Sequence, residues 1–353
     1  MGTSVHIASR FFALVLTSVL PDGSAAPSVP VDGESTTSAT AASPVVKRAR
    51  VEDFAPPEEF VMVDSIKTHF VRKGDAGRQV VLVHGFGSST HTWQKALDSL
   101  APRYRVYALD LKGFGLTAKP KDGQYHMDAY TRHLLGFLDA MKLDRPVLVG
   151  HSLGGAVVTR VALLHPGRVG GLVLESPVPV SMPRAPGDDL LKRAGVEGVV
   201  GGNKPGTAAE KAAILNPALA KRMLPTMLRS TITRQTVENG LKVAYHDPRF
   251  VTPELIEVVY RPLTLEGAAE ALASMLTPPP AAPPLPPLGA LRLPALVAWG
   301  EHDKVVPVTL FEQYAGTIPE ASRTVFANSG HVPHEEEADS FNARLLEFLD
   351  ELP

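Results

Sequence analysis

Short runs in which nearly every position is apolar recur along the chain. A strand that is covered on both faces needs apolar side chains at successive positions, so these runs predict buried parallel strands. An earlier stretch, 60–72, holds two β-prone runs around the polar pair Asp64-Ser65 and predicts a hairpin. The predicted buried strands lie at 79–85, 104–111, 146–150, 171–176, 294–300 and 323–327.

Between several of these runs, the apolar residues follow a helical period instead. Three stretches show apolar residues three and four positions apart, which is typical of one buried helix face. The alternation of strands with such helices predicts an α/β fold with a mostly parallel, doubly wound sheet. The three helix faces are Tyr130, Leu134, Phe137, Leu138 and Met141; Val157, Val158, Val161 and Leu164; and Phe341, Leu345, Phe348 and Leu349.

The alternation stops after residue 178 and resumes near residue 290. Helical stretches such as 208–228 and 253–260 alternate there with Pro and Gly, and the prolines of 277–294 favour extended chain. Near the N-terminus, 21–58 is rich in Pro, Ser, Thr and Ala and lacks the apolar surface for a core. We therefore expect a core of 59–178 and 290–353, a helical insertion with a Pro-rich connector at 179–289, and a leader or linker at 1–58.

Composition narrows the possible functions. The chain has 353 residues, 44% of them hydrophobic, and a net charge of −2, which argues against nucleic-acid partners. Cysteine is absent, so disulfides, thiolate metal sites and cysteine nucleophiles are excluded. The twelve histidines show no zinc-enzyme spacing, and we expect neither a metal nor an organic cofactor. No apolar run reaches the roughly 18 residues of a membrane span.

The N-terminus leaves the location open. The apolar run Phe11–Leu20 follows Arg10 and resembles the short core of a secretory signal, although Asp22 and Pro27 fit that pattern poorly. An organellar transit peptide and plain disorder are the alternatives. The expected location is exported or organellar if this segment is a leader, and cytoplasmic otherwise.

The hexapeptide GHSLGG (150–155) carries the first chemical signal. Its first five residues fit G-x-S-x-G, a buried strand runs directly into it, and an amphipathic helix follows. That context is typical of a nucleophile elbow, in which Ser152 adopts a strained backbone conformation on a sharp turn and Gly150 and Gly154 allow strand and helix to approach closely. The alternative is an ordinary Gly-rich turn with an incidental serine.

A serine nucleophile needs a base and a carboxylate that orients the base. Asp303 follows the strand 294–300 and is the favoured carboxylate over Glu301 and Glu175. His331, in the loop after the strand 323–327, is the favoured base, because the glutamates after His334 suggest a capping or salt-bridged role for that residue. The resulting order, Ser, Asp, His, differs from the orders of the chymotrypsin and subtilisin folds.

Two backbone amides are candidates for the oxyanion hole. Leu153 follows the nucleophile directly, and Phe86 lies in the loop HGFGSS (84–89) after the first buried strand. The glycines on either side of Phe86 would let that loop approach a substrate. His84 is expected to order the loop rather than to act as a second base.

Five motifs together resemble the α/β-hydrolase superfamily, in its branch of small capped hydrolases. They are VLVHGFGSS, LDLKGFGLTAKP, VLVGHSLGG, WGEHDKVVP and SGHVPHEEE. The resemblance covers the expected core and implies a triad of Ser152, Asp303 and His331, oxyanion amides at Phe86 and Leu153, and a helical cap at 179–289. Epoxide hydrolases and haloalkane dehalogenases of this kind carry aspartate where this chain has Ser152, so their chemistry is excluded.

The expected activity is hydrolysis of a small, apolar carboxylic ester through an acyl-enzyme. The same triad serves carbon–carbon bond hydrolases of the meta-cleavage type and perhydrolases, and the sequence does not separate these from an esterase. A ligand-binding receptor on a hydrolase fold is the alternative of a different class.

Overall fold

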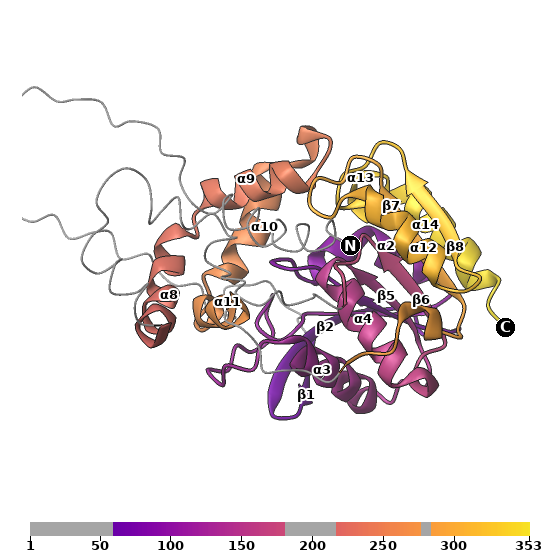
Figure 1. Ribbon diagram of the computed structural model, residues 1–353, viewed down its shortest axis with the longest axis horizontal. Coiled ribbons are helices and arrows are strands. Elements are labelled where there is room, and N and C mark those ends of the chain that lie inside the picture. Colours follow the sequence, from indigo (N-terminus) through magenta and orange to yellow (C-terminus); the bar gives the residue numbers. More distant parts are fainter. Residues whose placement is uncertain (1–58, 181–216, 277–283) are drawn as a thin grey trace, which may run out of the picture.

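The computed structural model describes residues 59–180, 217–276 and 284–353 (Figure 1). Three of the sequence predictions therefore lie wholly or partly outside the described residues. These are the possible leader and linker at 1–58, the first part of the predicted helix 208–228, and the first part of the Pro-rich connector.

A single eight-stranded sheet forms the centre of the protein, in the order β1-β2-β4-β3-β5-β6-β7-β8. The strands from β3 to β8 are parallel, and the hairpin β1-β2 joins the edge antiparallel to β4. The predicted α/β fold is confirmed, and each predicted strand is present close to its predicted bounds. The strands are β1 (Glu59–Val63), β2 (Ile66–Lys73), β3 (Gln79–Val83), β4 (Arg105–Leu109), β5 (Val147–His151), β6 (Gly171–Glu175), β7 (Ala295–Gly300) and β8 (Ser322–Phe326).

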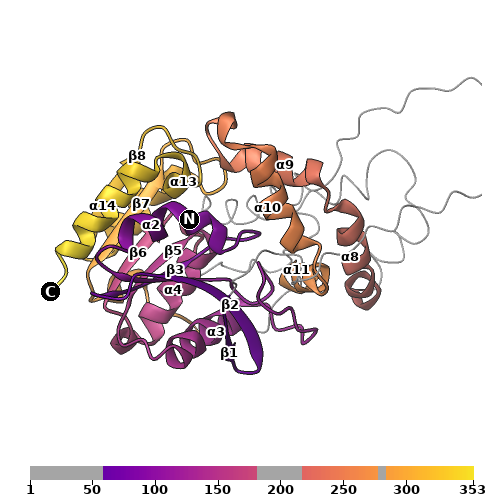
Figure 2. The ribbon, with the colours of Figure 1, turned by 180° about the vertical axis from the view of Figure 1, so that it is seen from behind.

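Helices cover both faces of the sheet (Figures 1 and 2). Val81 and Val83 of β3 pack into a core with α3, α4 and α12, whereas Val80 and Leu82 pack into a second core with α2 and α14. Because alternate residues of one strand enter opposite cores, every position of the strand is apolar. The helices of the core are α2 (Gln94–Leu100), α3 (Met127–Ala140), α4 (Leu153–Leu164), α12 (Phe311–Thr317), α13 (Pro333–Glu336) and α14 (Ala338–Asp350).

Among the described residues between β6 and β7 there are four further helices, and both ribbon views show them grouped beside the core (Figures 1 and 2). Threonine begins two of them, because Thr233 accepts a hydrogen bond from the Thr236 amide and Thr252 accepts one from Leu255. No helix among the described residues is long and apolar enough to cross a membrane. The four helices are α8 (Pro217–Thr231), α9 (Arg234–Ala244), α10 (Pro253–Leu263) and α11 (Ala268–Leu276).

Asp110, directly after β4, organises the loops on one side of the site. Its buried carboxylate contacts His69 Nδ1 at 2.7 Å and accepts the amides of Thr90 at 2.6 Å and Leu116 at 2.7 Å. Burial alone would raise the pKa of Asp110, but hydrogen bonding and charge from His69 outweigh it and lower the pKa to about 2. The Asp110 carboxylate thus fixes the loop that follows β3.

Candidate active site

Ser152 stands at a sharp turn between a strand and a helix. β5 ends at His151 and α4 begins at Leu153, so the serine is the one residue between them. Its backbone has φ 53° and ψ −114°, in a region that residues with a Cβ rarely adopt. Such a conformation costs about 1–3 kcal/mol and is typical of functional sites. The turn has the form that the nucleophile-elbow interpretation requires.

Two glycines permit this turn. A Cβ on Gly150 would lie 2.6 Å from the carbonyl oxygen of Gly154, and a Cβ on Gly154 would lie 2.2 Å from the carbonyl oxygen of Val83. Both distances are shorter than van der Waals contact allows. The close approach of β5, α4 and β3 therefore depends on the absence of side chains at these two positions.

We expect Gly154→Ala to destabilise the protein by about 3 kcal/mol, because the added methyl would overlap the backbone of β3. That strand is paired on both sides, with β4 and β5, and has little room to shift. Urea unfolding followed by circular dichroism would measure the change. Gly167→Ala is the matched control, because a Cβ there meets nothing within 4 Å. Equal stability of the two variants would contradict the steric explanation.

His331 and Asp303 form a buried pair at the ends of β8 and β7. His331 Nδ1 lies 2.8 Å from Asp303 Oδ2, and the two side chains are 6% and 0% exposed. Asp303 Oδ1 accepts the amides of Val305 and Val306, both at 2.8 Å. Because the carboxylate is an acceptor at both oxygens, a neutral His331 carries its proton on Nδ1 and a lone pair on Nε2.

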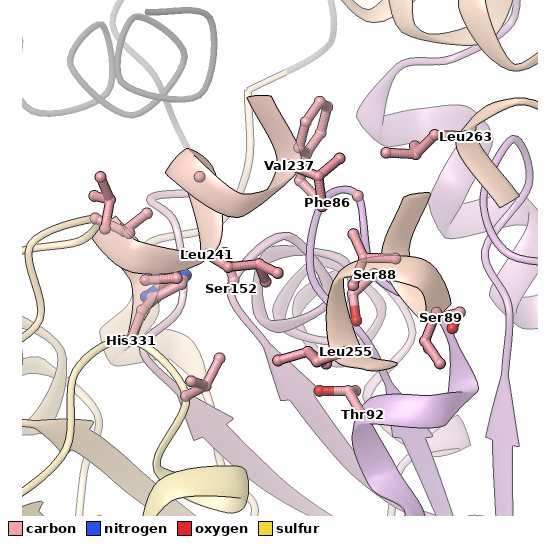
Figure 3. A pocket seen from close by; sticks show the side chains of 18 of the residues that line it. Phe86, Ser88, Ser89, Thr92, Ser152, Val237, Leu241, Leu255, Leu263 and His331 are labelled. Carbon is pink, nitrogen blue, oxygen red and sulfur yellow. The ribbon is translucent and has the colours of Figure 1, made fainter. Parts of the chain in front are cut away.

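Ser152 and His331 line one cavity (Figure 3). Ser152 Oγ is buried and has no hydrogen-bond partner among the described residues. His151 lies beside the pair, with its Nε2 2.8 Å from the carbonyl oxygen of His331. Burial, with the neighbouring His331 and His334, holds the pKa of His151 well below its ordinary value, so His151 stays neutral.

The predicted oxyanion amides lie on two segments that meet at Ser152. Leu153 is the first residue of α4, where helix hydrogen bonding leaves the N–H unused. Phe86 lines the cavity, and a Cβ on the preceding Gly85 would lie 3.0 Å from Ser152 Cβ. The Gly85 carbonyl oxygen is 2.6 Å from Nδ1 of His84, which burial keeps neutral by lowering its pKa. His84 therefore orders this loop.

The cavity has an apolar wall and a polar wall. Its volume is about 210 Å³. Helices α8 to α11 supply most of the apolar side chains, and the loop after β3, with α13, supplies hydroxyls and a carboxylate. Figure 3 shows Val237 and Leu241 of α9 and Leu255 and Leu263 of α10, with Ser88, Ser89 and Thr92 after β3. The apolar wall includes Leu228, Ile232, Val237, Leu241, Leu255, Val258, Val259, Leu263, Leu272 and Leu276.

A family model described as the alpha/beta hydrolase family matches residues 80–344. That match spans most of the chain and contains Ser152, Asp303 and His331. The chain belongs to this family. Since its relatives and its fold are those of hydrolases, the protein is an α/β-hydrolase enzyme.

Proteins similar to this hydrolase include a dienoate hydrolase, a meta-cleavage product hydrolase and an esterase. A 2-hydroxy-6-oxo-2,4-heptadienoate hydrolase of Pseudomonas putida is 30% identical over 301 residues, covering 82% of this chain and 95% of the relative. Two solved structures share the fold. A meta-cleavage product hydrolase from Pseudomonas fluorescens has a TM-score of 0.64 at 24% identity over 84% of this chain and 98% of that one. An esterase from Thermogutta terrifontis has a TM-score of 0.61 at 23% identity over 84% and 99%.

The sequence offered Glu301 and Glu175 as alternatives to Asp303, and His334 as an alternative to His331, and in this hydrolase all three have other surroundings. Glu301 is exposed. Glu175 and His334 form their own buried pair, with His334 Nδ1 2.9 Å from the carboxylate and both side chains fully buried. None of these three residues lines the cavity. His334 is thus salt-bridged, and Glu175 is its partner.

A series of polar side chains linked by hydrogen bonds starts from this buried pair, and the sequence alone does not predict it. His334 Nε2 lies 2.6 Å from Thr92 Oγ1, Thr92 Oγ1 donates to Glu335, and the Tyr245 hydroxyl donates to Glu335 at 2.6 Å. Thr92, Glu335 and Tyr245 all line the cavity. The three come from distant parts of the chain, so no local motif signals the connection.

The loop that carries His331 is attached to the end of α9. The His331 amide donates to the carbonyl oxygen of Ala244 at 2.7 Å. One Glu336 oxygen accepts the Gly330 amide at 2.7 Å, and the other accepts the His246 amide at 2.8 Å and the Asp247 amide at 2.9 Å. The helical insertion and the His331 loop are therefore held together by one backbone hydrogen bond and by the Glu336 carboxylate.

The His334–Glu175 pair predicts a pH-dependent stability. Burial lowers the pKa of His334, but the Glu175 carboxylate outweighs burial and, with Glu335, raises the pKa above 6.5, while Lys95 acts in the opposite direction. His151, whose ring lies 5.0 Å away, stays neutral. A raised folded-state pKa means that protonation stabilises the fold. This contribution is fully present below pH 6.5 and is lost as pH rises through the folded-state pKa.

Urea unfolding of the native protein and of His334→Gln would measure this effect. We expect the stability difference to be largest near pH 5.5 and to shrink toward pH 8.5, by about 1.4 kcal/mol for each unit of pKa shift. His165→Gln, at an exposed histidine, is the control for the substitution itself. A pH-independent difference for His334→Gln would contradict the prediction.

Proposed function

We propose that this hydrolase cleaves carboxylic esters through an acyl-enzyme formed on Ser152. The observation that carries the proposal is the arrangement of the serine and the histidine in one cavity. Ser152 is strained at its turn with its Oγ unpartnered, and His331, held at Nδ1 by Asp303, lines the same cavity. A nucleophile, a base and an orienting carboxylate are the groups that acyl transfer requires.

In the proposed first half-reaction, Ser152 Oγ attacks the ester carbonyl carbon and His331 Nε2 takes its proton. The negative charge that develops on the carbonyl oxygen is stabilised by the amides of Leu153 and Phe86. His331 then donates the proton to the departing alcohol oxygen, and the acyl group remains bonded to Ser152. Asp303 stabilises the imidazolium and keeps its tautomer correct.

In the second half-reaction, water attacks the acyl-enzyme while His331 takes a proton from it. Collapse of the second tetrahedral intermediate returns that proton to Ser152 Oγ and releases the acid. We further propose that the insertion at 179–289 serves as a cap. Its support is the apolar wall that α8 to α11 contribute to the cavity, where an acyl or alcohol chain would be buried.

Carbon–carbon bond hydrolysis is the second candidate, and the Pseudomonas putida relative with this kind of activity favours it. A panel of para-nitrophenyl esters and a vinylogous diketone, compared by kcat/KM, separates the two candidates. We expect higher kcat/KM for a short-chain ester, and labelling of the Ser152 peptide by a fluorophosphonate probe. If the diketone were preferred, the second candidate would replace the first. Absence of both activities and of labelling would overturn the proposal.

A further inference from the structure

The polar wall of the cavity carries one carboxylate and no permanent cation among the described residues. Of the described residues that line the cavity, none is lysine or arginine, and Glu335 is the one acidic residue. The Glu335 side chain is 20% exposed, so it faces the cavity while it is largely withdrawn from bulk water. Charges in such a setting interact more strongly than charges in solvent.

Neutral groups hold the Glu335 carboxylate. Thr92 Oγ1 and the Tyr245 hydroxyl both donate to it. Burial, together with the Glu335 charge, raises the pKa of Tyr245 well above its ordinary value, so this phenol remains a neutral donor. Lys95 is exposed, and its Nζ binds the Glu335 carbonyl oxygen at 3.0 Å rather than the carboxylate. Solvent screens the lysine charge.

The hydrogen-bonded side chains that lie behind Glu335, namely Thr92, His334 and Glu175, do not neutralise its charge. The one Thr92 hydroxyl proton is directed to Glu335, so His334 Nε2 must donate to Thr92 Oγ1 while Nδ1 donates to Glu175. His334 is then an imidazolium between two carboxylates, with its Nε2 3.7 Å from Glu335. The one positive and two negative charges of His334, Glu175 and Glu335 leave this group of side chains with a net charge of −1.

We propose that Glu335 determines the charge specificity of the cavity, so that uncharged substrates are accepted and substrates bearing a carboxylate are rejected. This inference rests on the proposed ester hydrolysis at Ser152. A substrate carboxylate would meet a like charge in a partly desolvated space, with no lysine or arginine among the described lining residues to pair with it. Dienoate substrates of the kind in the Pseudomonas putida relative's name carry such a carboxylate and should be poor substrates.

Three para-nitrophenyl esters of similar length test this specificity at a pH near 8, above the ordinary histidine pKa of about 6.5. They are the hexanoate, the adipate monoester, which is anionic, and its methyl ester, which is neutral. For the native enzyme, kcat/KM for the methyl ester should exceed that for the monoester at least about tenfold. Equal values for these two substrates would overturn the proposal.

Glu335→Gln removes the charge and keeps one acceptor oxygen, which can receive the Thr92 hydroxyl, while its NH₂ group can donate to the Tyr245 hydroxyl oxygen. It should lower the ratio of kcat/KM between methyl ester and monoester by about tenfold. Glu347→Gln, the same change at a side chain on α14 that is 63% exposed, should leave this ratio unaltered. A folded Glu335→Gln enzyme with an unchanged ratio would contradict the assignment.

Ligand binding to the native enzyme tests the inference without turnover. Phenylhexanamide should raise the Tm, and phenylhexanoate, which differs by its charge, should not. Equal Tm shifts would overturn the charge specificity even if Glu335→Gln failed to fold. If no ester were hydrolysed but the amide alone shifted the Tm, the proposed function would fail and the charge specificity would stand.

Discussion

Replacing Ser152 with alanine is expected to lower kcat/KM toward a short-chain para-nitrophenyl ester by about 10⁴-fold or more. The variant retains Leu153, Phe86 and the cavity, so the activity that remains is the part that oxyanion stabilisation and binding provide alone. Labelling by a fluorophosphonate probe should be lost as well. Initial rates at low substrate concentration, with the protein shown to be folded, measure the effect.

Ser176→Ala is the matched control for this experiment. Ser176 follows β6 as Ser152 follows β5, it also has a positive φ, and its buried Oγ also has no partner among the described residues. It does not line the cavity. We expect Ser176→Ala to retain its rate and its labelling. Turnover that survived in Ser152→Ala would identify another residue as the nucleophile.

Asp303→Asn is expected to lower kcat by about 10⁴-fold while the fold remains intact. An asparagine can accept the Val305 and Val306 amides through its oxygen, and its NH₂ group then faces His331. A donor at that position favours the tautomer with the lone pair on Nδ1 and the proton on Nε2. Such a histidine cannot take a proton from Ser152.

Glu301→Gln provides the comparison for Asp303→Asn. Glu301 lies two residues before Asp303 and is exposed, so the same loss of charge is made in the same loop without a contact to His331. Its kcat should stay close to that of the native enzyme. If both variants lost activity to the same degree, a general effect of the loop would explain the result better than tautomer control.

Much of this site could be predicted from the sequence because its parts are encoded locally. A strand that is apolar at every position, a Gly-rich turn and an amphipathic helix predict the position of Ser152 at the end of β5, where the structure has it. Asp303 and His331 follow strands of the same parallel sheet, whose carboxyl ends share one edge. Local pattern and sheet topology together are enough to bring these three residues to one edge.

The residues proposed to determine the charge specificity of the cavity could not be predicted from local sequence patterns. Tyr245, Thr92 and Glu335 meet only through tertiary packing, and nothing near each of them in the sequence encodes the others. The glutamates after His334 suggest only a capping or salt-bridged role for that histidine, whereas in the structure Glu335 lines the cavity and Glu336 binds the amides of Gly330 and His246. Charge patterns alone do not indicate which carboxylates are solvated.

The carboxylate of Glu336 has a consequence for how this enzyme can diversify. It joins the segment after α9, which helps to shape the substrate cavity, to the loop that carries the proposed base. A change of backbone conformation at 244–247 that admitted a new substrate would also disturb these hydrogen bonds to the His331 loop, so substrate range and turnover are coupled there. The part of the apolar wall formed by α10 and α11 has no such connection to the His331 loop among the described contacts, so substitutions there can change specificity with the smallest effect on turnover.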